Sequence, residues 1–125
     1  MDVFEKFLSD HIAAKNMGFY WTDPLQIIEQ INLEINEVKA ELNMGNREAL
    51  QSELGDMLHA CLNLIDYCEF DVRQTMEKAV AKIGKRFETM REMIAEEGGV
   101  DFEKQPRAIK MQYWEKVKQQ LLDAD

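Results

Sequence analysis

Four carboxylates recur in two pairs along the middle of this chain, and both pairs share one spacing. Glu34 and Glu37 stand three positions apart in NLEINEV. Glu53 and Asp56 repeat that spacing in SELGDML. On a helix, residues three apart project from one side, and carboxylates held close repel one another unless a positive charge lies between them. Hard cations such as Mg²⁺ prefer these oxygen ligands and commonly bridge them to substrate phosphates, so the four side chains are candidate metal ligands.

A solvated surface is the other interpretation of these carboxylates. Acidic pairs on helices usually face water, and spacing beside an apolar stripe leaves the two interpretations equally open. Gly55 stands between Glu53 and Asp56, where it costs about 1 kcal/mol relative to Ala in a helix. A functional site that needs space would justify that cost, and so would close packing of two helices.

The elements that must position these carboxylates are helices. Apolar residues recur at intervals of three and four, with no alternating strand pattern, in five segments that cover residues 4–12, 24–42, 50–69, 72–94 and 106–121. Five helices in 125 residues, joined by short connections, predict a single all-α domain over residues 1–125. The expected fold is an antiparallel bundle of four to five helices.

Local signals mark where these helices begin and end. Asp23 followed by Pro24 predicts the N-cap and first turn of the second helix. Gly45 can end that helix in the left-handed conformation, and Asn46 can cap the third helix. The tight turn makes these two helices antiparallel neighbours, so both acidic pairs are expected at one seam. The EEGGVD stretch, residues 96–101, predicts a loop.

The charge of the chain excludes several classes of partner. With 24 acidic and 15 basic residues, the formal net charge is −9. Nonspecific binding to nucleic acid or to an anionic membrane needs a basic surface, so neither partner is expected. A phosphorylated small ligand stays compatible with this charge, because bound divalent cations reverse the local field.

The two cysteines and the N-terminus predict a cytoplasmic protein. Cys61 and Cys68 fall seven positions apart on one predicted helix, where their Cα atoms would lie roughly 10 Å apart, too far for a disulfide. Reduced cysteines are typical of the cytoplasm. The first residues, MDVFEKFLSDHIAAKN, carry charges throughout and resemble neither a signal peptide nor a membrane span.

The paired acidic motifs, together with the sequence around them, resemble the MazG family of nucleoside triphosphate pyrophosphohydrolases. The resemblance covers roughly residues 19–122 and includes ExxE at Glu34–Glu37 and ExxD at Glu53–Asp56. The segments WTDP, ELGDML, KIGKRFETM and WEKVK follow the same pattern. The family is all-α, uses Mg²⁺, and hydrolyses nucleoside triphosphates to monophosphates and pyrophosphate, a reaction that can remove aberrant nucleotides.

The resemblance implies a role for each matched acidic residue. It makes Glu34, Glu37, Glu53 and Asp56 ligands of Mg²⁺, with Mn²⁺ as a substitute. Glu37 and Glu53 are the candidate catalytic carboxylates, and Glu37 is the candidate to orient or deprotonate the attacking water.

The resemblance also implies two basic groups and one aromatic group at the substrate. Lys82 and Arg86 match the pair that contacts the phosphates, and their spacing of four puts both on one helix face. Trp114 matches an aromatic position that contacts the nucleotide. Without the resemblance, the two cations are typical of a solvated surface and Trp114 of a core or an interface.

Two positions depart from the family pattern. Leu33 stands where the first motif usually has another glutamate, which concerns the residues that support the metal ligands. Val80 stands where many relatives have an asparagine near the substrate, which leaves the preference for base and sugar open.

Two other functions remain as alternatives. A di-iron carboxylate bundle is suggested by Asp56-Met57-Leu58-His59, which imitates the E-x-x-H motif of such sites. The other histidine, His11, has no carboxylate three residues before it, so a second motif is missing. A non-enzymatic helical interaction module is the second alternative, because eight methionines permit adaptable packing against a partner.

Self-association is the last expectation. A bundle of this size can leave apolar faces that a second copy covers, and relatives in the family are dimers or pairs of dimers. We therefore expect a homodimer or a dimer of dimers whose last helix contributes to the interface or to a neighbouring active site.

Overall fold

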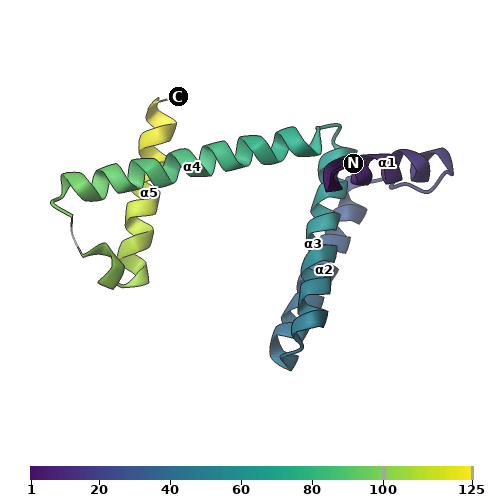
Figure 1. The fold of residues 1–125 in the computed structure, drawn as a ribbon, viewed down its shortest axis with the longest axis horizontal. Coiled ribbons are helices and arrows are strands. Elements are labelled where there is room, and N and C mark those ends of the chain that lie inside the picture. The colour runs from purple at the N-terminus through teal and green to yellow at the C-terminus, as the bar shows by residue number, and fades with distance from the viewer. Residues whose placement is uncertain (100, 125) are drawn as a thin grey trace. The chain divides into compact units, whose positions relative to one another are not determined.

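The computed structural model describes residues 1–99 and 101–124, and this part of the chain is helical with no strand. The elements are α1 (Val3–Asn16), α2 (Pro24–Met44), α3 (Arg47–Tyr67), α4 (Val72–Glu96), the short 3₁₀ helix η1 (Phe102–Lys104) and α5 (Arg107–Ala124) (Figure 1). The predicted all-α fold is confirmed. Of the predicted EEGGVD loop, Val100 lies outside the described residues. None of the helices described is both long and apolar enough to cross a membrane.

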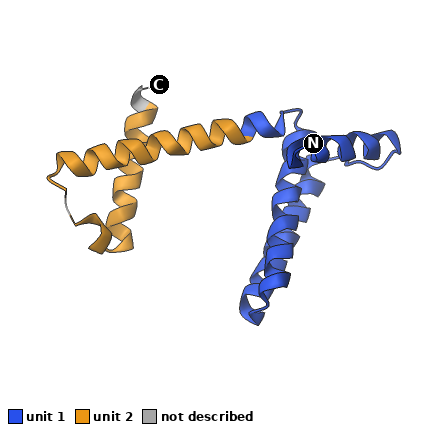
Figure 2. Ribbon diagram, in the orientation of Figure 1, with its two compact units in different colours: residues 1–75 blue, residues 76–125 orange. Residues whose placement is uncertain are grey.

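The chain divides into two compact units, which are described separately (Figure 2). The first unit comprises residues 1–75 and contains α1, α2, α3 and the first residues of α4. The second unit comprises the rest of α4 together with η1 and α5. All four candidate metal ligands belong to the first unit, so its local structure determines their geometry.

Helices α2 and α3 form an antiparallel pair that lies side by side (Figure 1). The Asp23 side chain caps α2 by accepting a hydrogen bond from the Leu25 N–H at 2.8 Å. Gly45 ends α2 with φ +74°, in the left-handed region that glycine adopts without strain. The Asn46 side chain then accepts from the Ala49 N–H at 3.1 Å and begins α3. The predicted caps are confirmed, and this turn forces the two acidic pairs into one seam.

Buried apolar side chains hold the first unit together. They come from every helix of that unit: Phe7, Ile27, Leu50, Ala60 and Val72. Removing these side chains from water stabilises the unit by about 25 cal/mol for each Å² of apolar surface. The core therefore connects α1 to the α2–α3 pair, close to the carboxylates.

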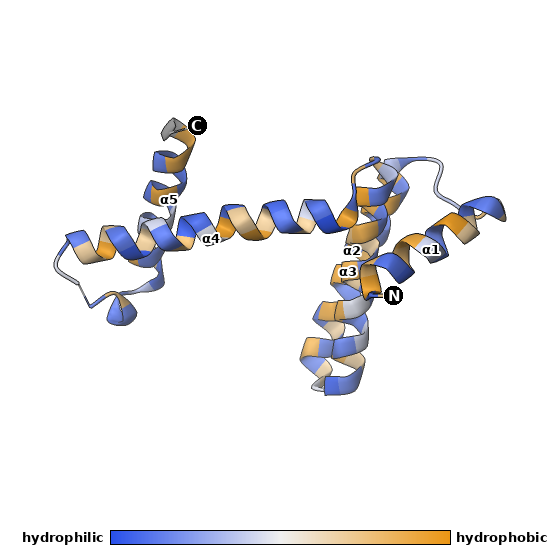
Figure 3. Cartoon of the chain, turned by 45° about the horizontal axis from the view of Figure 1, so that its top comes forward, coloured by the Kyte–Doolittle hydropathy of each residue, from blue (hydrophilic) through white to orange (hydrophobic). Residues whose placement is uncertain are grey.

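Several apolar residues on the periodic faces of the helices are exposed. Ile28, Leu42, Leu54, Met76 and Phe87 are each more than two fifths exposed. Figure 3 shows hydrophobic and hydrophilic residues alternating along the helices. Periodicity identifies such an apolar face without identifying what covers it.

Gly55 does not mark a close approach between helices. A Cβ atom added at this position would meet nothing within 4 Å. The close-packing explanation is therefore wrong for the described chain, and the open space beside Glu53 and Asp56 remains.

In the second unit, contacts from α5 fix the segment that follows α4. Tyr113 donates a hydrogen bond to the Glu97 carboxylate, and its ring meets Phe102 edge-on with centroids 5.3 Å apart. Lys110 Nζ donates to the Glu103 carbonyl at 2.9 Å. Val117 is fully buried within this unit. These contacts tie η1 to α5.

Candidate functional site

Three glutamates meet at the seam between α2 and α3. Glu34, Glu37 and Glu53 each offer a carboxylate oxygen, and these oxygens all lie within 4.8 Å of one another. Glu34 is buried, Glu53 is half-buried and Glu37 is exposed. The spacing of three on α2 places the first two on one side of the helix, and the antiparallel partner supplies the third. We call these three residues the glutamate triad.

Two buried oxygens of the glutamate triad have no hydrogen-bond partner. Glu34 Oε1 accepts a hydrogen bond from Gln30 Nε2 at 2.7 Å. Glu34 Oε2 and Glu53 Oε2 are buried and have no hydrogen-bond partner. A buried carboxylate oxygen without a partner is costly, and a cation is the species that satisfies several such oxygens together. The donor set, made of carboxylate oxygens, fits a hard divalent cation.

The charge of the glutamate triad changes how Glu53 titrates. The pKa of Glu53 is raised to about 7, chiefly by a hydrogen bond shared with Glu37 and then by burial and the negative charge of Glu37. Asp56 and Glu34 add smaller contributions of the same sign. Without a cation, the site therefore holds a proton up to near-neutral pH.

Asp56 lies beside the glutamate triad and is not a member of that close group. Its charge contributes to the raised pKa of Glu53. It also lines, with Glu34, a cavity of about 220 Å³ whose other walls are Trp21, Gln30, His59, Ala60 and Asn63. We call this the acidic cavity. The structure thus brings three of the four predicted ligands together and places the fourth on the wall of the adjoining cavity.

The predicted substrate-binding residues belong to the second unit. Lys82 is exposed on α4, and Arg86 stands one turn later on the same helix. The Arg86 guanidinium lies 5.8 Å from the centre of the Trp114 ring, which also meets Phe87 at 5.5 Å. The structure thus brings Arg86 and Trp114 together within one unit, while the four carboxylates lie in the other.

The histidine of the suspected iron motif takes no part in the glutamate triad. The ring of His59 lies 5.6 Å from that of His11, between centroids. Burial and the neighbouring His11 lower the pKa of His59. Among the described residues, the cluster with metal-ligand spacing consists of glutamates, so Asp56 and His59 do not form a histidine–carboxylate centre.

The two residues that depart from the family pattern are both accessible. Leu33 on α2 is 56% exposed and Val80 on α4 is 60% exposed. Leu33 therefore puts an apolar side chain in solvent next to Glu34, where a further glutamate would have added negative charge.

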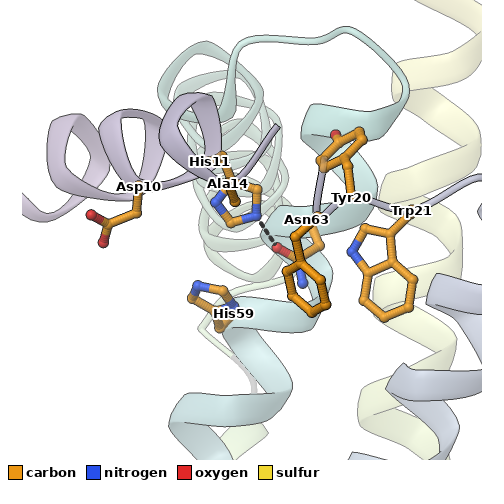
Figure 4. A pocket seen from close by; sticks show the side chains of 8 residues that line it. Asp10, His11, Ala14, Tyr20, Trp21, His59 and Asn63 are labelled. Atoms are coloured by element: carbon orange, nitrogen blue, oxygen red, sulfur yellow. Dashed lines mark hydrogen bonds between the residues drawn. The ribbon is translucent and has the colours of Figure 1, made fainter. Parts of the chain in front are cut away.

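An aromatic cavity next to the carboxylates was not foreseen from the sequence. It has a volume of about 420 Å³ and is lined by Asp10, His11, Ala14, Phe19, Tyr20, Trp21, His59 and Asn63 (Figure 4). The available signal was the run FYW, residues 19–21, where three aromatic residues interrupt the helical pattern. Periodicity treats such a segment as a break between helices and does not indicate that it forms a wall.

Comparison with known families and proteins places this site in context. Residues 22–91, more than half of the chain, match the MazG nucleotide pyrophosphohydrolase domain. The chain is 34% identical over 105 residues to the nucleoside triphosphate pyrophosphohydrolase/pyrophosphatase MazG of Thermotoga maritima, covering 84% of this chain and 40% of that protein. It is 30% identical over 114 residues to a nucleoside triphosphate pyrophosphohydrolase of Escherichia coli K12, covering 86% and 41%. The chain thus spans about two fifths of the length of these curated relatives, and it belongs to the MazG nucleotide pyrophosphohydrolase domain family.

Proposed function

We propose that residues 1–125 act as one catalytic domain that hydrolyses a ribo- or deoxyribonucleoside triphosphate to the monophosphate and pyrophosphate in a metal-dependent reaction. The observation that carries the proposal is the glutamate triad, in which two buried carboxylate oxygens lack a hydrogen-bond partner. Family membership supports the reaction class, and the two relatives carry the same activity in their names.

The four acidic residues would hold the metal ion. Glu34 and Glu53 supply the buried oxygens, Glu37 the exposed one, and Asp56 a further carboxylate from the wall of the acidic cavity. We infer Mg²⁺, with Mn²⁺ as a substitute, because both accept carboxylate oxygens. When bound, such an ion neutralises phosphate oxygens and lowers the pKa of water.

Glu37 is the member of the glutamate triad that water reaches. Its exposed carboxylate orients the attacking water and accepts its proton as the oxygen bonds to phosphorus. In the metal-free chain Glu53 shares a hydrogen bond with Glu37, so the two carboxyl groups lie next to each other. The bond between the α- and β-phosphates breaks, and pyrophosphate leaves with its electron pair.

Three residues of the second unit are the proposed substrate contacts that the family resemblance implies. Lys82 and Arg86 neutralise the phosphate charge that develops as pyrophosphate leaves. Trp114 contacts the nucleotide, and its neighbour Arg86 lies over its ring, an arrangement that fixes the guanidinium.

Self-association is part of the proposal. The exposed apolar residues on α2 and α3 include Ile28, Leu33, Leu42, Leu54 and Leu58. Covering these faces with a second copy removes them from water, which supports a homodimer or a dimer of dimers. Binding to nucleic acid or to a membrane is not part of the proposal, because the net charge is −9.

The proposed location is the cytoplasm, and the proposed role is removal of aberrant nucleotides. Cys61 and Cys68 are both free thiols, which suits a reducing compartment.

The deciding experiment measures pyrophosphate release from a panel of canonical and modified triphosphates with Mg²⁺ or Mn²⁺. We expect release by the wild type and its loss in Glu53→Ala, with the fold retained by circular dichroism. No release from any triphosphate would reject the proposal and favour a non-enzymatic interaction module. Stoichiometric iron by elemental analysis would favour the di-iron alternative instead.

A further inference from the structure

The aromatic cavity is formed by three segments of the first unit. Helix α1 supplies Asp10, His11 and Ala14, the loop before α2 supplies residues 19–21, and α3 supplies His59 and Asn63. Rings therefore make up most of its wall, as Figure 4 shows. Its volume of about 420 Å³ is sufficient for a flat heterocycle with part of an attached sugar.

This cavity adjoins the acidic cavity. Trp21, His59 and Asn63 line both of them. The acidic cavity continues to Glu34 and Asp56, the proposed metal ligands. A single ligand can therefore place an aromatic ring in one cavity and a phosphate group near the metal ion that the carboxylates would hold, which is the shape of a nucleotide.

A cluster of polar contacts holds the aromatic wall in position. The Tyr20 hydroxyl donates a hydrogen bond to Asp66 Oδ2 at 2.7 Å. Lys15 Nζ forms an ion pair with the same oxygen at 3.3 Å and lies 4.3 Å from the centre of the Tyr20 ring. Tyr67 stacks on Tyr20 with centroids 5.9 Å apart. The loop is thus attached to both α1 and α3, and Trp21, the next residue, is presented from a fixed base.

Among the residues that line this cavity, Asn63 is the polar one that is buried. Its residue is 8% exposed, and its Oδ1 lies 2.5 Å from His11 Nε2. His11 Nδ1 lies 3.1 Å from the Phe7 carbonyl, an acceptor, so Nδ1 carries the proton. With the proton on Nδ1, Nε2 of neutral His11 is an acceptor, so it pairs with the NH₂ group of the Asn63 amide once the amide oxygen and nitrogen are exchanged. The rest of the amide stays available to a ligand.

We propose that the aromatic cavity receives the base of the nucleotide, and that Asn63, oriented by His11, is a specificity-determining residue that hydrogen-bonds the polar edge of that base. The inference rests on the proposed function and deepens it. The rings of the wall stack on any base, so stacking adds affinity without much selectivity. A buried amide distinguishes bases, because a base that fails to pair with it leaves a polar group unsatisfied.

The first experiment compares selectivity across substrates. Steady-state kcat/KM for pyrophosphate release is measured with dATP, dCTP, dGTP and dTTP for the wild type, Asn63→Leu and Asn63→Asp. Gln51→Leu is the matched control, because it makes the same kind of change at an exposed position of α3. Asn63→Leu should reduce the ratio between the best and worst substrates about tenfold. Asn63→Asp, which presents acceptors, should raise the ratio of amino-bearing bases (A, C) to oxo-bearing bases (G, T).

The second experiment measures binding without catalysis. Trp21 and Trp114 are the two tryptophans of the chain, so Trp114→Phe leaves Trp21 as the fluorescent reporter. Neutral nucleosides, without metal, isolate the aromatic cavity from the carboxylates. Saturable quenching is expected, with affinity about tenfold weaker when Asn63→Leu is added and unchanged when Gln51→Leu is added.

The outcomes separate this inference from the proposed function. Pyrophosphate release with no quenching by any nucleoside, or with unchanged base ratios in folded Asn63→Leu and Asn63→Asp, would overturn the base cavity and leave the reaction intact. Saturable, Asn63-dependent quenching without release of pyrophosphate from any triphosphate would reject the reaction and retain the cavity as a base-binding site.

Discussion

Glu34 on α2 and Glu53 on α3 each bury one carboxylate oxygen, Oε2, without a hydrogen-bond partner, and the two residues belong to a triad whose oxygens lie within 4.8 Å. Two such oxygens on adjacent helices raise the free energy of the folded chain unless a proton or a cation lies among them. Because its pKa is raised to about 7, Glu53 carries that proton below neutral pH. A divalent cation supplies the same compensation at higher pH.

Replacing Glu53 by Gln should weaken metal binding and remove most of the activity. The substitution keeps the size of the side chain and deletes one charge of the glutamate triad. We expect kcat/KM for pyrophosphate release to fall about 10²–10³-fold, because the triad loses one of the charged ligands that would hold the metal ion, and the reacting phosphates are then less well neutralised. Above pH 7, where Glu53 is charged, the melting temperature of the metal-free protein should rise, because repulsion within the triad is reduced.

The control for this substitution is Glu29→Gln, an exposed glutamate on α2 away from the triad. It should leave both the activity and the Mg²⁺ affinity measured by calorimetry within about twofold of the wild type. Equal losses in the two variants would show that overall charge, and not the triad, supports activity.

The stability of the metal-free protein should fall as the pH rises from about 4.5 to about 7. The pKa of Glu53 is raised from 4.5 to about 7 in the folded chain. Between these values the folded state holds a proton that the unfolded state has released, so unfolding releases protons and raising the pH favours it. Urea unfolding across this range should show the decline. Saturating Mg²⁺ should remove it, and a metal-free Glu53→Gln protein should lack this component.

Much of the frame around this site follows from local sequence signals. Asp23, Pro24, Gly45 and Asn46 act within a few residues of their own positions, so the bounds of α2 and α3 could be predicted from sequence alone. The spacing of three in each acidic pair likewise follows from the helix repeat.

Contacts between distant residues could not be predicted in this way. His11 and Asn63 are 52 positions apart, and their hydrogen bond depends on how α1 packs against α3. The same limit applies to Asp56, because periodicity gives its side of the helix without the distance to Glu34. The exposure of Leu54 could not be predicted either, because an amphipathic pattern shows that a face is apolar and does not specify what packs against it.

Removing the Asp66 carboxylate should loosen the aromatic wall. Burial, followed by the hydrogen bond to Asp66, raises the pKa of Tyr20 above its ordinary value. Asp66→Ala deletes that hydrogen bond and the Lys15 ion pair, and should cost about 1–2 kcal/mol in the free energy of unfolding. Lys15→Ala, which removes the partly exposed cation, should cost about 0.5 kcal/mol or less.

An ultraviolet titration of the tyrosines provides a second measurement for Asp66→Ala. The pKa of Tyr20 should fall toward its ordinary value in this variant and stay raised in Lys15→Ala, because the hydrogen bond to Asp66 remains. KM should rise in Asp66→Ala, while kcat changes less, because Tyr20 lies away from the glutamate triad. A loss of kcat with unchanged KM would contradict the proposal that Asp66, Lys15 and Tyr20 position the aromatic wall.

Replacing Arg86 by Ala should lower the rate of hydrolysis while changing the stability of the fold little. Its guanidinium lies over the Trp114 ring at 5.8 Å, where its proposed role is to neutralise phosphate charge. We expect kcat/KM to fall about 10²-fold, with partial recovery in Arg86→Lys, since Lys retains the charge without the planar fork. Arg91→Ala, at an exposed position of the same helix, is the control and should change kcat/KM less than twofold.

Introducing a charge on the exposed apolar face of α3 should weaken self-association. Leu58 is 59% exposed, and Leu58→Glu would place a carboxylate in any interface that covers it. The dissociation constant of the oligomer, from light scattering over a dilution series, should rise at least tenfold, because the buried charge would lack a partner. Ser52→Glu adds the same charge at an exposed polar position of α3 and should leave the constant unchanged. A monomeric wild type at every concentration would show that these apolar faces remain uncovered.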